Sequence, residues 1–183
     1  MSDEPKGSHA PGDWGPPRSR TTTWYDPRVH ASAASTLSGL DFLHAVRDGL
    51  LPRPPIAQLM GFALVEVALG LAVFECTPDE SVYNPIGVVH GGLVCTLADS
   101  AAGCAVQSTL EAGVAYTSID INVTYLRPLT KDSGLIRATG RLTKPGRKVA
   151  YATVEVTDRT GKLVAQATSS CLVMDNRDTA PTW

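Results

Sequence analysis

The residues best suited to chemistry are Asp99 and the triplet His90-Gly91-Gly92, which lie in and before one apolar, small-residue stretch, residues 91–110. An ionised carboxylate among Leu, Val, Ala and Cys side chains loses several kcal/mol of hydration, roughly, unless a partner or a function compensates. A chemical role for Asp99 is therefore the leading hypothesis. The alternative is a structural carboxylate, paired with Ser100 or Thr96 or exposed on one stripe of a helix.

The two glycines predict an anion or oxyanion site at the start of a helix. Glycine leaves the backbone N–H groups unobstructed, and the first N–H groups of a helix have no partner within it. The positive end of the helix dipole reinforces this preference for negative charge. Taken by itself, His-Gly-Gly could simply form a tight turn. The carboxylate of Asp99, eight residues after Gly91 on the same helix, favours the oxyanion site.

The spacing of these groups predicts a second subunit. Eight helical residues place Asp99 about 12 Å along the axis from the Gly91 amide, too far for both to contact one reacting carbonyl. If they cooperate, they come from two chains. Small residues such as Ala102 and Gly103 would let that partner approach the helix closely. Alternatively, they would fit under a tightly wrapped sheet, and the two explanations are compatible.

The elements that position these groups follow from periodicity and turn residues. Ser38 is an N-cap candidate for a short helix that ends before the Pro-rich residues 51–55. Period-two alternation bounded by turn residues predicts six strands. They are Phe62–Val67, Leu71–Cys76, Tyr116–Leu126, Leu135–Thr143, Val149–Thr157 and Leu163–Met174. The expected fold is α+β, an antiparallel sheet of about six strands wrapped around one long, buried central helix.

Composition limits the possible partners. Residues 1–35, rich in Pro, Gly and Ser, are expected to form a mobile N-terminal arm, followed by one domain over 36–176 and a short tail over 177–183. The net charge of −2 gives no basic field for nucleic acid. The arm has no apolar signal segment, and His90, Asp99 and Gln107 interrupt the one apolar stretch, so we expect no membrane span and a cytoplasmic protein. Four cysteines without CxxC spacing indicate buried thiols, not a disulfide or zinc site.

One stretch carries a family resemblance. Residues 84–99, NPIGVVHGGLVCTLAD, follow the pattern N-x-x-G-x-x-H-G-G-x-x-x-x-L-x-D of the PaaI-like acyl-CoA thioesterases. Residues 116–128, YTSIDINVTYLRP, are similar to the next strand of that family and its closing Arg-Pro. The resemblance covers residues 38–174 and implies the hotdog fold.

The resemblance implies hydrolysis of an acyl-CoA thioester to a free acid and coenzyme A, with no metal and no cofactor beyond the coenzyme A of the substrate. Gly91 would hold the oxyanion, Asn84 would help to place the carbonyl, and His90 would set the loop geometry. Asp99 of a facing subunit would act as general base or nucleophile, and Ser118 would orient the water. His90 as the base is the weaker alternative, because the positive end of the helix disfavours its protonation.

The remaining site predictions concern the coenzyme A part of the substrate. The backbone of Gly92 belongs to the same anion-binding turn. Basic residues in turns, although each is more often simply solvated, could meet the phosphates. They are Arg127, Lys144, Arg147 and Lys148. The resemblance further implies a homodimer and a dimer of dimers, with phenylacetyl-type or medium-chain acyl groups as substrates by analogy.

Two other functions use similar parts. A hotdog dehydratase or hydratase binds acyl thioesters but needs a His and carboxylate pair at one substrate carbon, whereas the spacing here fits the Gly and Asp arrangement better. A non-catalytic acyl-CoA-binding module would use the same pocket without turnover. Thiol release from a panel of acyl-CoAs separates these possibilities.

Overall fold

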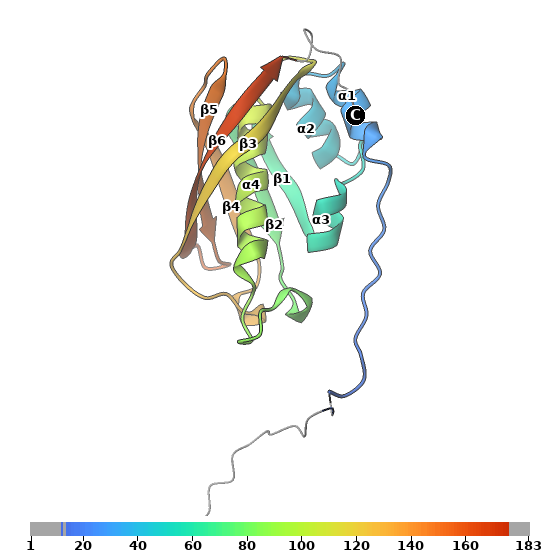
Figure 1. Cartoon of the computed structure of the whole chain (residues 1–183), viewed down its shortest axis with the longest axis vertical. Helices are drawn as coiled ribbons and strands as arrows, with labels where there is room; N and C mark the ends of the chain where they lie inside the picture. The colour runs from blue at the N-terminus through green and yellow to red at the C-terminus, as the bar shows by residue number, and fades with distance from the viewer. Residues whose placement is uncertain (1–11, 13, 176–183) are drawn as a thin grey trace, which may run out of the picture.

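The fold is built around helix α4 (Gly91–Gln107), on which nine residues are buried. The computed structural model describes residue 12 and residues 14–175. Six antiparallel strands form one sheet that curls around this helix in the order β1-β2-β4-β5-β6-β3 (Figure 1). The hotdog architecture predicted from the sequence is thereby confirmed.

The strands match the predicted segments to within a few residues. The first two strands are joined at Gly70, whose φ of 73° glycine adopts readily. The strands are β1 (Phe62–Ala68), β2 (Leu71–Cys76), β3 (Val114–Tyr125), β4 (Ile136–Lys144), β5 (Val149–Thr157) and β6 (Leu163–Asp175). Among the described residues, strand β3 pairs only with β6 and forms one edge of the sheet.

Of the three shorter α-helices in the described part of the chain, two were not predicted. Helix α2 (Gly39–Arg47) begins as expected at Ser38, whose side chain accepts a hydrogen bond from the Asp41 N–H at 3.2 Å. Helix α3 (Pro55–Met60) begins at the last residue of the segment 51–55 that was interpreted as a helix stop, because proline is well tolerated in the first turn of a helix. The chain also forms two 3-10 turns, η1 (Glu80–Val82) and η2 (Lys131–Ser133).

The third α-helix, α1 (Arg28–Ala34), falls within the segment assigned to the N-terminal arm. It is bonded to the domain: His30 Nε2 lies 2.8 Å from the Pro52 carbonyl oxygen, and the Gly113 N–H donates to the Ala34 carbonyl at 3.1 Å. Residues 14–27 run as an extended chain beside the domain (Figure 1). Contacts with the domain are therefore made by residues before residue 35, within the segment assigned to the arm.

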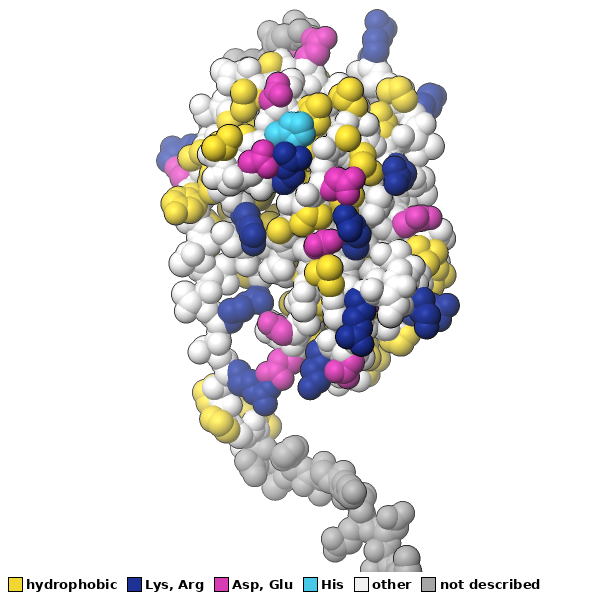
Figure 2. Space-filling view, turned by 180° about the vertical axis from the view of Figure 1, so that it is seen from behind, with side chains coloured by type: hydrophobic (Ala, Val, Ile, Leu, Met, Phe, Trp, Pro, Cys, Tyr) yellow, Lys and Arg dark blue, Asp and Glu magenta, His cyan; other side chains and the backbone are white. Residues whose placement is uncertain are grey.

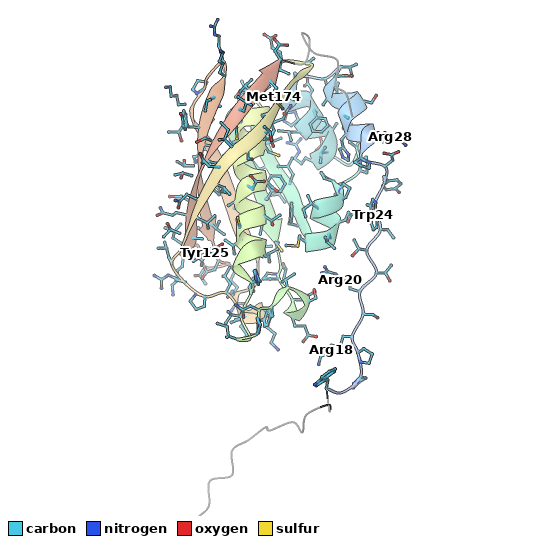
Figure 3. The ribbon with its side chains drawn as sticks, in the orientation of Figure 1. Arg18, Arg20, Trp24, Arg28, Tyr125 and Met174 are labelled. Atoms are coloured by element: carbon cyan, nitrogen blue, oxygen red, sulfur yellow. The ribbon has the colours of Figure 1, made fainter. Side chains whose placement is uncertain are left out.

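Arginines, not aromatic residues, connect the extended segment to its own domain. Arg18 pairs with Glu80, and Arg20 Nη1 lies 4.0 Å from Asp79 (Figure 3). The aromatic side chains of this segment are exposed: Trp14 by 90%, Tyr25 by 68% and Trp24 by 64%. The predicted tail, residues 177–183, and residues 1–11 and 13 of the arm lie outside the described residues.

Small residues let the sheet wrap closely around α4. A Cβ added to Gly140 of β4 would lie 2.1 Å from the Ala101 carbonyl oxygen, and one added to Gly103 would lie 2.2 Å from the Tyr116 hydroxyl. Gly103 therefore lies under β3 of its own chain and is not available for a partner. The wrapped-sheet explanation therefore holds for Gly103, and also for Ala102, which is fully buried.

The surface carries charged side chains of both signs, in agreement with the net charge of −2. Figure 2 shows acidic and basic side chains interspersed over one face of the molecule. Within the described ranges, no helix has the length and apolar character needed to cross a membrane.

We expect Gly140→Ala to lower the free energy of unfolding by about 1–3 kcal/mol, because the added methyl group overpacks the contact between β4 and α4. Urea denaturation followed by circular dichroism measures this change. Thr143→Ala, on an exposed part of the same strand, serves as control and should change stability by about 0.5 kcal/mol or less. Equal effects of the two substitutions would contradict the proposed close contact.

Candidate active site

The N-terminus of α4 presents one uncommitted backbone donor. The Nδ1 atom of His90 accepts a hydrogen bond from the Gly92 N–H at 2.8 Å, and the His90 carbonyl accepts from Leu93 N–H at 3.0 Å. Within the described residues, the Gly91 N–H has no hydrogen-bond partner. It lies at the positive end of a helix of 17 residues, where a developing negative charge is stabilised. The cap also requires the neutral His90 tautomer with its proton on Nε2.

The loop before this helix is shaped by Asn84. Its Oδ1 accepts from the backbone N–H groups of Ile86 at 3.1 Å and Val88 at 3.2 Å. The His90 N–H in turn donates to the Val82 carbonyl at 2.8 Å. These bonds fix the approach to the helix and leave the Nδ2 amide group of Asn84 without a hydrogen-bond partner among the described residues.

A cleft of about 290 Å³ opens beside Gly91. Its walls include Tyr125 and Arg127 from the end of β3 and the turn that follows. The Tyr125 hydroxyl donates to the Gly91 carbonyl at 2.9 Å, and a Cβ added to Gly91 would lie 3.0 Å from Cζ of that ring (Figure 3). Glycine is thus required at position 91 for this ring contact, whereas any residue except proline would supply the N–H. We call this space the Gly91 cleft.

Asp99 lies further along α4, where β3 positions it. The Ser118 hydroxyl donates to Asp99 Oδ1 at 2.7 Å, and the Asp99 side chain is half-buried. A β-bulge follows Ser118, between Ser118 and Asp120, and the buried Ser169 hydroxyl donates to the Asp120 carbonyl at 2.8 Å. One carboxylate oxygen of Asp99 therefore has a fixed partner, while Oδ2 has no hydrogen-bond partner within the described part of the chain.

The groups around Asp99 are neutral. Burial, and to a smaller extent the negative charge of Asp99, raise the pKa of Cys104 to about 12. Burial and the same charge also raise the pKa of Cys95, and burial raises the pKa of Tyr116 well above its ordinary value. These thiols and the phenol stay protonated at neutral pH, so they do not compete with Asp99 as bases.

The predicted site residues form two groups within one subunit. Asn84, His90, Gly91, Gly92 and Arg127 gather at the N-terminal end of α4, whereas Asp99 and Ser118 lie together farther along it. The helix between Gly91 and Asp99 is unbroken, so about 12 Å of axial distance separates the groups.

The other three basic candidates lie at the opposite end of α4. Arg147 and Lys148 border a hollow that also contains Val106 and Leu110, so they are far from Gly91 of their own chain. Lys144 Nζ lies 5.8 Å from the centre of the Tyr151 ring. Only Arg127 of the four basic candidates lines the Gly91 cleft.

Two tyrosines were absent from the prediction. Tyr125 contacts Gly91, and Tyr116 packs over Gly103 beside Asp99. Period-two alternation placed both on one strand, but nothing in the sequence tells which helix residue each ring contacts.

Comparison with known proteins agrees with the fold and the motif. Residues 86–165 match the thioesterase superfamily. The chain is 36% identical over 104 residues to human acyl-coenzyme A thioesterase 13, an alignment that covers 56% of this chain and 73% of the relative.

Solved structures give the same family. A phenylacetic acid degradation-related protein of Ralstonia eutropha is 30% identical, with a TM-score of 0.65 over 71% of this chain and 98% of that one. The PaaI protein of Escherichia coli, 22% identical, has the same fold with a TM-score of 0.65 over 76% of this chain and 96% of that one. The chain belongs to the thioesterase superfamily and is PaaI-like.

We expect Ser118→Ala to lower kcat for thioester hydrolysis about tenfold to a hundredfold, because a hydrogen bond to a charged group contributes about 1.5–3 kcal/mol. Steady-state kinetics should show a much smaller change in KM, since Ser118 contacts Asp99. Ser170→Ala, on the neighbouring strand, is the matched control. A loss of kcat in both variants would point to damage to the sheet instead of loss of this hydrogen bond.

Proposed function

We propose that this protein hydrolyses acyl-CoA thioesters to a free acid and coenzyme A, in a site shared by two subunits. The observation that carries the proposal is the carboxylate of Asp99, oriented by Ser118 on a rigid helix whose N-terminus presents the free N–H of Gly91. The name of the human relative, an acyl-coenzyme A thioesterase, supports this substrate class.

The free edge of β3 supports a homodimer. A strand of 12 residues with unpaired backbone groups and an Ile119 side chain that is 56% exposed favours pairing with another strand. In an antiparallel pair of two β3 strands, a twofold axis relates the subunits. The larger assembly implied by the resemblance, a pair of such dimers, would leave this interface unchanged.

The contacts of β3 predict where that axis passes. Along β3, Ser118 lies beside Asp99 of its own chain, and Tyr125 lies beside Gly91. A twofold axis that passes midway between Ser118 and Tyr125 brings Ser118 of each strand opposite Tyr125 of the other. It places Asp99 of one subunit opposite Gly91 of the other, which removes the 12 Å separation.

The chemistry follows from these two groups. The thioester oxygen accepts from the Gly91 N–H, and Asp99 of the facing subunit takes a proton from a water molecule as its oxygen attacks the carbonyl carbon. The tetrahedral intermediate then expels the coenzyme A sulfur, and the proton held by Asp99 passes to that thiolate. Direct attack by Asp99, the nucleophilic alternative, would use the same placement.

The remaining predicted residues bind and orient the substrate. The free Nδ2 of Asn84 helps to place the carbonyl, and the Gly92 turn and Arg127 line the path of the coenzyme A part. The same twofold axis carries the C-terminal end of the facing α4 past Gly91. Arg147 and Lys148 of the facing subunit, with Lys144 nearby, then approach the phosphates. The scheme uses protein groups and water, with no cofactor.

The cap at His90 disfavours the dehydratase alternative. Its Nδ1 already accepts from the Gly92 N–H, so this nitrogen is not available to take a proton from a substrate carbon. An acyl-CoA-binding module remains distinguishable, because it would bind acyl-CoA without releasing thiol.

We expect the purified protein to release free thiol from acyl-CoAs, and Asp99→Asn to lower kcat at least about a hundredfold, because the change removes the base at nearly constant volume. A thiol reagent measures the release, and circular dichroism with size-exclusion chromatography checks fold and assembly. Binding of acyl-CoA without thiol release by the wild type would reject hydrolysis. Undiminished turnover in Asp99→Asn would reject the role of Asp99.

Mixing two inactive variants tests the shared site. Asp99→Asn lacks the carboxylate, and Gly91→Pro lacks the N–H donor. A heterodimer of the two contains one site with both groups intact, so we expect mixed subunits to regain up to about half of the wild-type activity per heterodimer.

The Gly91→Pro chain is used only after its fold and dimerisation have been shown, and heterodimers are isolated with two different affinity tags. Each variant mixed with itself is the control. If the isolated heterodimers stay inactive, the shared site is rejected, and Gly91 and Asp99 either act within one chain or have structural roles.

A further inference from the structure

Two arginines of the extended segment contact the domain through their side chains. Arg18 pairs with Glu80, the first residue of η1, and Arg20 Nη1 lies 4.0 Å from Asp79, the residue before it (Figure 3). A second nitrogen of Arg20 donates to the Leu59 carbonyl of α3. Residues two positions apart in an extended chain project to the same side, so both guanidinium groups face the domain.

The turn η1 is connected by hydrogen bonds to the start of α4. Asp79 Oδ1 accepts from the Ser81 N–H at 2.8 Å and so begins the turn. The carbonyl of Val82, the last residue of η1, accepts from the His90 N–H at 2.8 Å. His90 caps α4 and directly precedes Gly91. A series of polar contacts therefore leads from the two arginines to the backbone amide of Gly91.

We propose that Arg18 and Arg20 are positioning residues for thioester hydrolysis: by holding η1 in place, they fix the orientation of the Gly91 N–H. The inference rests on the proposed thioesterase function, in which this N–H stabilises the oxyanion. Because the oxyanion develops only on the way to the transition state, a loosely held donor lowers kcat more than it raises KM.

The two ion pairs hold η1 weakly and reversibly. All four charged side chains are exposed. An exposed pair is screened by salt, and it shifts an equilibrium by no more than about fivefold. Since both pairs act on the same turn, their effects combine. The turn is therefore held at low ionic strength and released as the salt concentration rises.

Direct binding of substrate phosphates is the alternative role for these arginines. The carboxylates and the Leu59 carbonyl already occupy both guanidinium groups, which favours positioning. The two roles differ in the kinetic constant that they affect. Loss of a phosphate contact raises KM, whereas loss of positioning lowers kcat.

Four variants separate these roles. Arg18→Gln/Arg20→Gln removes both charges from the segment. Arg18→Glu places two negative charges together, and Arg18→Glu/Glu80→Arg restores an opposite pair with the two positions exchanged. Arg28→Gln is the matched control, because Arg28 Nε pairs with Asp26 Oδ2 at 2.8 Å within the same segment.

The measurements are kcat and KM for an acyl-CoA at about 0.05 M and about 0.5 M NaCl, which bracket strong and weak screening. Hydrogen exchange of the backbone amides of residues 82–92 reports the order of the loop without reference to activity. Circular dichroism and size-exclusion chromatography establish that each variant folds and assembles.

We expect Arg18→Gln/Arg20→Gln to lower kcat about threefold to tenfold at low salt, with a change in KM of less than about twofold, from the combined effect of two exposed pairs. The amides of residues 82–92 should exchange faster in this variant. High salt should lower kcat of the wild type towards that of the variant, and leave the variant almost unchanged. Arg18→Glu should lose activity that Glu80→Arg restores, and Arg28→Gln should match the wild type.

Unchanged kcat and unchanged exchange in Arg18→Gln/Arg20→Gln at low salt would overturn the proposal. A raised KM at constant kcat, not restored by the exchanged pair, would overturn it in favour of phosphate binding. An equal loss in Arg28→Gln would reduce the effect to net charge and overturn it as well. If the wild type hydrolyses no acyl-CoA, the proposed function fails, whereas the exchange measurement still shows whether the arginines hold the loop.

Discussion

The rigidity of α4 is the constraint on which the site depends. An α-helix rises by 1.5 Å per residue and does not bend enough to bring residues eight positions apart to one atom. Gly91 and Asp99 are both on this helix, and the wrapped sheet holds it straight and buried along one side. A buried helix gives each group a fixed orientation, and the same rigidity makes one chain insufficient for the proposed reaction.

The sheet contributes by controlling what α4 leaves uncovered. Gly140 and Gly103 permit close contact on the covered side, where any larger residue would push strands away from the helix. On the other side, β3 contacts α4 through particular side chains, Tyr116, Ser118 and Tyr125. One edge strand therefore covers part of the helix, orients Asp99, closes the cleft beside Gly91 and retains a free edge for a second subunit.

Local signals were sufficient for most of the fold. Ser38 marked the start of α2, and alternation marked all six strands, because both depend on neighbouring residues alone. Helix α3 was missed because Pro54 and Pro55 stop a preceding helix and begin a new one equally well. The spatial order of the sheet, with β3 beside β6, depends on contacts between distant segments and had no local signal.

The same distinction applies to the site. Gly91, His90 and Asp99 were predicted from spacing within one helix and the turn before it. The contact between Ser118 and Asp99 joins two elements, and family resemblance suggested Ser118 without indicating that it contacts Asp99 in the same chain. Arg127, Lys144, Arg147 and Lys148 have the same charge and similar turn settings, and only the folded chain separates Arg127 from the other three.

The choice of histidine as the cap of α4 has a consequence for its neighbour two positions along the chain. Serine, threonine or asparagine would accept the Gly92 N–H through a shorter side chain. The imidazole ring of His90 instead lies against residue 92, where a Cβ would be 2.9 Å from Nδ1 and 3.3 Å from Cε1. The ring thus takes up the space that a side chain at position 92 would need. The second glycine of the pair is therefore the steric counterpart of a histidine cap.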